Sequence, residues 1–339
     1  MWRFANYVFD TLTVLEFAGG YVVGKDTFMK DAISNTNWNI VPGNCSFTSR
    51  SVRLDEKLEA FLEPVSVKHP IYFPNVWVQS FLKTRKGQID AKRLPCRMQG
   101  HMGSVGADSI HYLVQEVDFD EDGVNEALLT MHGKRHITFG YLFRKNANNW
   151  LLEAVLPQSS RGIPIDSFTI LPREKIIYYY DRGWGTCYGS GSLAVHKYVN
   201  GRWKLALHVP AWEWSCGLSY FSSQDNIESM LCTINSDTIR MSYSYLLQVD
   251  DHQSDAESLE RVFQSPVFDA RWNWSVEKEK YVFCKGSEFV QLLLTAEDPV
   301  LACFTYYEKE LRRTAKNDSS KTGRLLRDFF TAAGRPAAE

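Results

Sequence analysis

Residues 139–157 read FGYLFRKNANNWLLEAVLP, and residues 192–210 read SLAVHKYVNGRWKLALHVP. Each segment has an alternating apolar and polar stretch, a polar turn, a tryptophan that opens the second stretch, and a closing proline. This alternation is typical of paired strands. Asn200-Gly201 is a strong signal for a two-residue turn, because both residues tolerate positive φ. The two segments therefore predict β-hairpins.

The hairpin pattern recurs in residues 268–284, FDARWNWSVEKEKYVFC, and two further strand-like runs precede each copy. Four strands that end in a hairpin are the unit of a β-propeller blade. The closing prolines Pro157 and Pro210 lie about 50 residues apart, a spacing typical of such repeats. We therefore expect each hairpin to form the outer two strands of its sheet, with Trp150 and Trp203 at equivalent positions. A single twisted meander or a sandwich is the alternative.

These patterns divide the chain into three regions. Residues 1–100 form a mixed N-terminal region, in which the apolar run 71–82 reads as an edge strand. Residues 101–305 hold the propeller-like β repeats, and residues 306–339 form a C-terminal helix and tail. The expected fold is mainly β: a propeller-like array of four-stranded antiparallel sheets, with a mixed N-terminal segment and a C-terminal helix.

The composition excludes several classes of protein. The chain has 339 residues, of which 44% are hydrophobic and 23% charged, as in ordinary globular proteins. Its net charge of -2 gives no field that would recruit nucleic acid. No clear signal peptide or membrane span is visible, so we expect a cytoplasmic protein by default, or one exported by an unconventional route. Seven scattered cysteines favour reduced, buried thiols over disulfides or zinc.

One motif carries chemistry. Residues 118–128 read DFDEDGVNEAL, with acidic side chains at positions 1, 3, 5 and 9 of a loop and glycine at position 6. Such a loop points oxygen ligands at a hard cation, the glycine permits the sharp turn, and position 7 supplies a backbone carbonyl. The predicted ligands of one calcium ion are Asp118, Asp120, Asp122, Val124 (through its carbonyl) and Glu126. The alternative is an acidic surface turn without a metal.

The segment VDFDEDGVNEALL, residues 117–129, resembles the calcium loops of FG-GAP and VCBS repeats, which occur in integrin-type β-propellers and in many bacterial surface and secreted proteins. The resemblance is close over this segment and extends in general pattern over residues 108–305. It implies a structural Ca²⁺ that clamps the first two strands of a blade and takes no part in catalysis. The chain departs from the family in having one intact loop and no Phe-Gly-Gly-Ala-Pro segment.

Four aromatic residues fall between the expected strands: Trp184, Tyr188, Trp212 and Trp214. Exposed aromatics on loops are typical anchors for partners, so we assign these residues to partner binding, with a buried core role as the alternative. We favour a non-enzymatic, calcium-stabilised binding protein that presents loops to a protein or glycan partner. The alternative is a hydrolase or lyase with a pocket built on the propeller-like sheet. No acid–base group stands out, so no catalytic residue is assigned.

Overall fold

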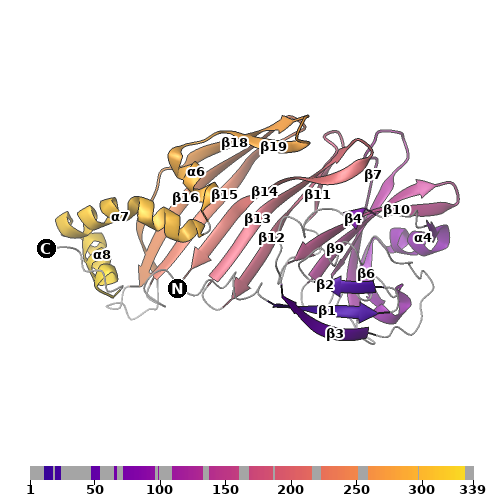
Figure 1. The fold of residues 1–339 in the computed structure, drawn as a ribbon, viewed down its shortest axis with the longest axis horizontal. Helices are drawn as coiled ribbons and strands as arrows, with labels where there is room; N and C mark the ends of the chain where they lie inside the picture. The colour runs from indigo at the N-terminus through magenta and orange to yellow at the C-terminus, as the bar shows by residue number, and fades with distance from the viewer. Residues whose placement is uncertain are drawn as a thin grey trace. The chain divides into compact units, whose positions relative to one another are not determined.

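Antiparallel strands dominate the structure, a computed structural model, and helices follow them at the C-terminal end (Figure 1). The structure describes residues 11–17, 20–23, 47–53, 65–66, 72–95, 98, 109–132, 137–159, 168–185, 188–215, 223–250, 259–296 and 298–332. The chain is therefore mainly β, as the alternating patterns predict.

The chain divides into two compact units. The first unit comprises Met1–Arg182 and Ala194–His208, and the second comprises Gly183–Leu193 and Val209–Glu339. Three long strands each contribute residues to both units.

The first unit holds a seven-stranded antiparallel sheet. Its strands are β4 (Val65–Ser66), β5 (Tyr72–Pro74), β6 (Lys86–Asp90), β7 (Ser109–Val117), β8 (Glu126–His132), β9 (Ile137–Asn146) and β10 (Asn149–Ser159). Their order is β4-β10-β9-β8-β7-β6, and β5 also pairs with β10. A short 3-10 helix, η1, spans Ala91–Arg93. A separate three-stranded sheet, in the order β2-β1-β3, contains β1 (Thr11–Phe17), β2 (Gly20–Val23) and β3 (Phe47–Arg53).

The edge strand expected at residues 71–82 is wrong. Only β5 is extended, and helix α4 (Asn75–Thr84) begins directly after Pro74. Its buried residues Val78, Phe81 and Leu82 follow the i, i+3, i+4 spacing of one helix face. A short apolar run cannot be assigned to strand or helix by periodicity alone, and here packing against the sheet decides.

A nine-stranded antiparallel sheet runs through residues 169–285. Its strands are β11 (Thr169–Leu171), β12 (Ile176–Gly185), β13 (Tyr188–Val199), β14 (Arg202–Ser215), β15 (Ser223–Ile234), β16 (Thr238–Asp250), β17 (Leu259–Gln264), β18 (Phe268–Ser275) and β19 (Lys280–Lys285). The order of hydrogen-bonded neighbours is β11-β12-β13-β14-β15-β16-β18-β19, with β17 paired to β16.

The predicted hairpins are confirmed, as β9–β10, β13–β14 and β18–β19. Asn200 and Gly201 have φ of 51° and 78°, as the two-residue turn requires. Trp150 and Trp203 are both buried and occupy the second position of their return strands.

The expected four-stranded sheets do not appear among the described strands, which form sheets of three, seven and nine. The pairing continues sideways: the end of β14 pairs with β15, with Glu213 opposite Ile227, and β15 pairs along most of its length with β16. The hairpin β13–β14 therefore lies inside its sheet, and the expectation that it forms two outer strands is wrong. The recurring hairpin pattern reports local pairing but not where a sheet ends.

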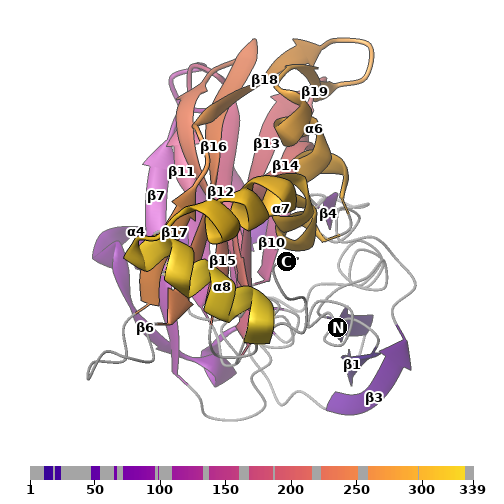
Figure 2. The ribbon, with the colours of Figure 1, turned by 90° about the vertical axis from the view of Figure 1, so that its left-hand side faces the viewer.

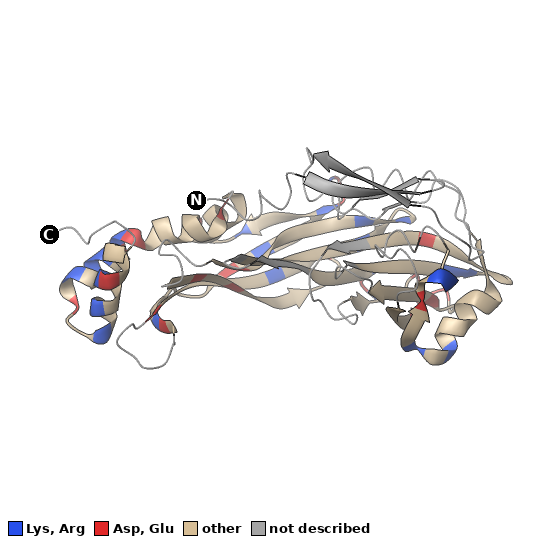
Figure 3. Ribbon diagram, turned by 90° about the horizontal axis from the view of Figure 1, so that it is seen from below, with Lys and Arg blue, Asp and Glu red and all other residues tan. Residues whose placement is uncertain are grey.

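Three helices complete the second unit: α6 (Glu288–Thr295), α7 (Pro299–Asn317) and α8 (Lys321–Ala332). They pack against strands β15 to β18 of their own unit (Figure 2). This confirms the expected C-terminal helix. Acidic and basic positions are interspersed on the helices near the C-terminal end (Figure 3), as on ordinary solvated helix faces.

The described cysteines form no disulfides. Cys303 is buried, whereas Cys232 and Cys284 are exposed. The expectation of buried thiols therefore holds for Cys303 only, among the cysteines in the described ranges.

Candidate metal centre

The acidic motif connects β7 to β8, where Val117 pairs with Glu126 and closes the loop. This strand-to-strand setting agrees with the flanks of the motif and differs from the two helices of an EF-hand. The turn is tight, since Glu121 and Gly123 have positive φ values of 63° and 83°. A Cβ at position 123 would meet no atom within 4 Å, so the glycine is favoured by backbone conformation and not by crowding.

Hydrogen bonds within the loop curl it around Asp118. The two carboxylate oxygens of Asp118 accept from the amides of Asp122 and Gly123, at 3.1 and 2.8 Å. The Asp122 carboxylate accepts from the amide of Val124 at 2.8 Å. The loop therefore holds its own shape through side chain to backbone contacts.

Three of the predicted ligands converge. One carboxylate oxygen from each of Asp118, Asp120 and Glu126 lies within 4.8 Å of the others. Asp122 and Val124 are exposed, and Asp122 is not a member of this group. We name Asp118, Asp120 and Glu126 the acidic triad.

Glu126 is the buried member of the triad, with 1% of its surface exposed. Its Oε2 accepts from the amide of Phe119 at 2.8 Å. Its Oε1 and the Oδ1 of Asp120 are buried and accept no hydrogen bond from the residues that the structure describes. Burial raises the pKa of Glu126, partly offset by the Phe119 amide and the guanidinium of Arg144. The triad therefore contains oxygen atoms that would gain from a cation.

Arg144 on β9 lies against the triad. Its Nη1 is 3.1 Å from Asp120, its Nη2 is 3.0 Å from Glu153, and its Nε is 3.9 Å from Oε1 of Glu126. Nη2 also donates to the hydroxyl of Tyr198 at 3.1 Å. Burial lowers the pKa of Arg144, but the charge of Glu153 and the contact with Tyr198 outweigh it, and the net shift is upward.

The local charge does not balance. The triad and Glu153 supply four carboxylates, against the single guanidinium of Arg144. Burial raises the pKa of Glu153 as well, although Arg144 and Tyr198 oppose that rise. A divalent cation beside the triad would remove most of the remaining negative charge.

Phe119 ties the loop to the core of the first unit. Phe119 stands between Asp118 and Asp120 in the sequence, and its side chain is buried. Its ring meets the ring of Trp203 edge-on, with centroids 5.1 Å apart. Loop closure and core packing are therefore coupled, and an ion held by the triad would stabilise both.

Sequence reasoning missed Arg144, Glu153 and Tyr198. Glu153 lies at an irregularity of the β9–β10 pairing, between Leu152 and Ala154, and bulges of this kind re-aim a side chain. The available signal was a charged residue within each of the apolar runs YLFRK and WLLEAV, which indicates a buried ion pair.

The four aromatic residues expected on loops lie within strands. Trp184 belongs to β12, Tyr188 to β13, and Trp212 and Trp214 to β14. The side chains of the first two fall outside the described residues. Trp212 and Trp214 are half-buried on one face of β14, where each indole occupies the space that a Cβ on Gly191 or Gly189 would need. The alternating pattern of β14 continues through AWEWS, so the loop assignment is corrected.

Comparisons of the chain with known protein families, curated proteins and solved structures found no match. Among the helices that the structure describes, none is long and apolar enough to cross a lipid bilayer.

Proposed function

We propose that the 118–126 loop binds one calcium ion and that the protein is a non-enzymatic, calcium-stabilised binding protein. The acidic triad would supply three carboxylates, and Asp122 and the Val124 carbonyl would complete the shell. The observation that carries the proposal is the convergence of the triad, in which the buried Oε1 of Glu126 accepts no hydrogen bond from the described residues. Hard oxygen ligands in a glycine-containing loop favour Ca²⁺ over zinc or copper. The resemblance to FG-GAP and VCBS loops implies the same structural role.

Thermal melts in calcium and in chelator test the proposal. At a hundredfold excess over Kd, an ion that binds only the folded state adds about 2.7 kcal/mol. For a domain of this size, that raises the melting temperature by about 5 to 10 °C. Asp120→Asn should lose most of this rise, because it removes one charged ligand of the triad. Glu121, the exposed acidic residue next to Asp120, gives a matched control: Glu121→Gln should keep the rise in melting temperature with calcium.

Arg144 provides the second arm of this experiment. If Arg144 and calcium share the neutralisation of the triad, Arg144→Gln should melt lower in chelator and gain more from calcium than the wild-type protein. Equal melting temperatures of the wild-type protein in calcium and in chelator would contradict the proposal, and so would an Arg144→Gln protein that calcium does not restore. Either result would leave an acidic turn neutralised by Arg144 alone.

The proposed partner surface is the strip formed by Trp212 and Trp214. Residues two apart on a strand share a face, and both indoles are half-buried, so each keeps some surface in contact with solvent. Large, rigid aromatic side chains are common anchors in recognition surfaces, and a flat pair suits a glycan or a protein partner.

A glycan array tests the strip directly. The wild-type protein should bind at least one glycan class, and Trp212→Ala and Trp214→Ala should each lose most of that signal. Trp274→Ala, a half-buried tryptophan on β18, is the control and should keep it. An unchanged array pattern for both variants would remove the strip from the binding surface.

A further inference from the structure

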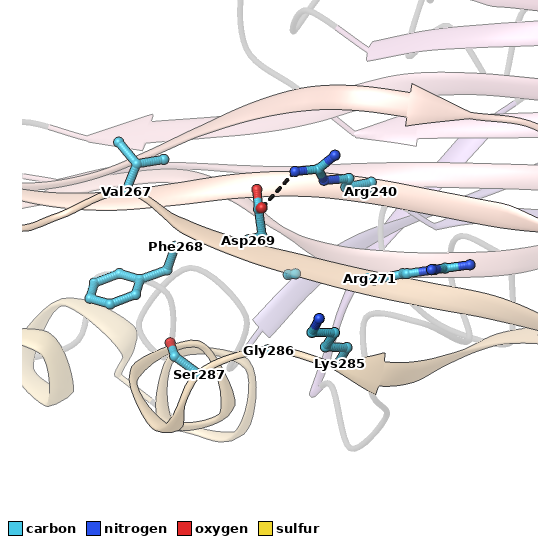
Figure 4. A pocket seen from close by; sticks show the side chains of 9 residues that line it. Arg240, Val267, Phe268, Asp269, Arg271, Lys285, Gly286 and Ser287 are labelled. Atoms are coloured by element: carbon cyan, nitrogen blue, oxygen red, sulfur yellow. Dashed lines mark hydrogen bonds and ion pairs between the residues drawn. The ribbon is translucent and has the colours of Figure 1, made fainter.

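The second unit has a pocket at the edge of its sheet, and its lining includes no residue of the loop or strip described above. It has a volume of about 580 Å³, within the range typical of small-molecule sites. Strands β16, β18 and β19 line it, and the turn at Gly286 and Ser287 leads from it into α6 (Figure 4).

Three basic residues lie in register on the strands that line the pocket. Arg240 on β16 lies directly opposite Arg271 on β18, and Arg271 lies directly opposite Lys285 on β19. Like charges directly opposite one another on paired strands are destabilising. Two such pairs in one row are a cost to the sheet that an anion bound between them would relieve. We name Arg240, Arg271 and Lys285 the basic row.

The row is only partly neutralised. Arg240 pairs with Asp269 at 2.6 Å, while the Nε of Arg271 donates to the amide oxygen of Asn273 at 3.1 Å. Across the described part of the chain, Arg271 and Lys285 have no acidic partner. The lining therefore carries three positive charges and one negative charge.

The remaining walls are apolar. Val267 is 66% exposed, and Phe268 is half-buried with its ring 4.9 Å from that of Phe289. Ser287 caps α6 by accepting from the amide of Val290, so the positive end of the helix dipole faces the same region. The exposed Val267 beside the charged side chains suits an organic anion.

We propose that this pocket binds a small organic molecule through a phosphate group. An arginine fork and a lysine point charge are common ligands of phosphate oxygens. A phosphate monoester carries a charge of about -1.5 to -2 at neutral pH, which matches the surplus of two positive charges in the lining. The organic part would lie against Val267.

Calorimetric titration with phenyl phosphate tests this proposal. The wild-type protein should bind it saturably, and Arg271→Gln and Lys285→Gln should each weaken binding at least about tenfold. Lys280→Gln removes a charge from the same strand outside the pocket and should leave the affinity unchanged. Circular dichroism should show that all three variants are folded.

Two outcomes would overturn the proposal. One is binding that does not saturate in the millimolar range, and the other is equal affinity in the wild-type protein and the Arg271→Gln variant. Inorganic phosphate is the comparison ligand, and affinity equal to that of phenyl phosphate would refute the role of the apolar wall. The titration is run in chelator, so its result does not depend on the calcium site.

Discussion

Replacing Asp225 by Asn is expected to remove most of the pH dependence of the second unit's stability between about pH 4 and pH 7. Asp225 on β15 is 1% exposed and accepts a short hydrogen bond from the hydroxyl of Tyr245 on β16. Burial raises the pKa of Asp225 from 3.8 to about 7; the Tyr245 hydrogen bond opposes the rise, and the charge of Asp298 adds to it. No basic residue contributes to this shift.

The direction follows from the raised pKa. Below about pH 4 the carboxyl is neutral in both the folded and unfolded states, and the folded state bears no cost. As the pH rises to about 7, the unfolded state loses its proton first, so the free energy of unfolding falls by roughly 4 kcal/mol. Asn cannot ionise and keeps an oxygen that accepts from Tyr245. The variant should therefore be more stable than the wild-type protein above pH 7.

Urea unfolding at a series of pH values measures the effect. The control is Asp328→Asn, an exposed acid on α8, which should keep the wild-type slope. Parallel slopes for Asp225→Asn and the wild-type protein would show that Asp225 does not titrate in this range.

Local sequence signals identified the parts of this fold that local chemistry determines. Asn200-Gly201 forms the expected turn because positive φ is intrinsic to those residues. The acidic loop lies between two strands, and three of its carboxylates converge, because the spacing of ligands within a loop is a local property. Whether the loop holds calcium stays a prediction.

Non-local pairing determines what the sequence did not reveal. Arg144 reaches Asp120, Glu126 and Glu153 only because β8, β9 and β10 are neighbours, and no short segment contains that information. The basic row has the same origin in part, since Arg240 is brought into register with Arg271 by the pairing of β16 with β18, which are not consecutive strands. The number of strands in each sheet is likewise a property of lateral pairing, which periodicity does not report.

Buried titratable groups are a second feature without a local signal. His196 and Asp225 have ordinary sequence surroundings, and only the packing of the strands places each of them out of contact with water. The two lie in different units, and their expected effects on stability run in opposite directions with pH.

His196, in the first unit, is expected to make stability depend on pH in the opposite direction to Asp225. The side chain is fully buried on β13, its ring stacks on that of Tyr179 at 5.5 Å, and its Nε2 shares a hydrogen bond of 3.2 Å with the Tyr179 hydroxyl. Burial, with a smaller contribution from the nearby charge of His208, lowers the pKa of His196 from 6.5 to about 3. The imidazole is therefore neutral in the folded state over most of the acidic range.

A lowered pKa makes the folded state less stable in acid. Stability from the neutral imidazole is fully present above pH 6.5 and is lost as the pH falls towards 3, with a total of roughly 5 kcal/mol. His196→Phe keeps the stacking on Tyr179 and cannot take up a proton. It should cost about 1 kcal/mol at neutral pH through the lost hydrogen bond, and be more stable than the wild-type protein near pH 4.

Unfolding curves are measured for His196→Phe and for the control His111→Phe, which replaces an exposed histidine on β7. They test whether the buried imidazole causes the loss of stability in acid. Only the buried site should flatten the loss of stability between pH 6.5 and 4, because burial holds the His196 imidazole neutral in the folded state. If both variants lose stability in acid as steeply as the wild-type protein, protonation of His196 is not what unfolds the first unit.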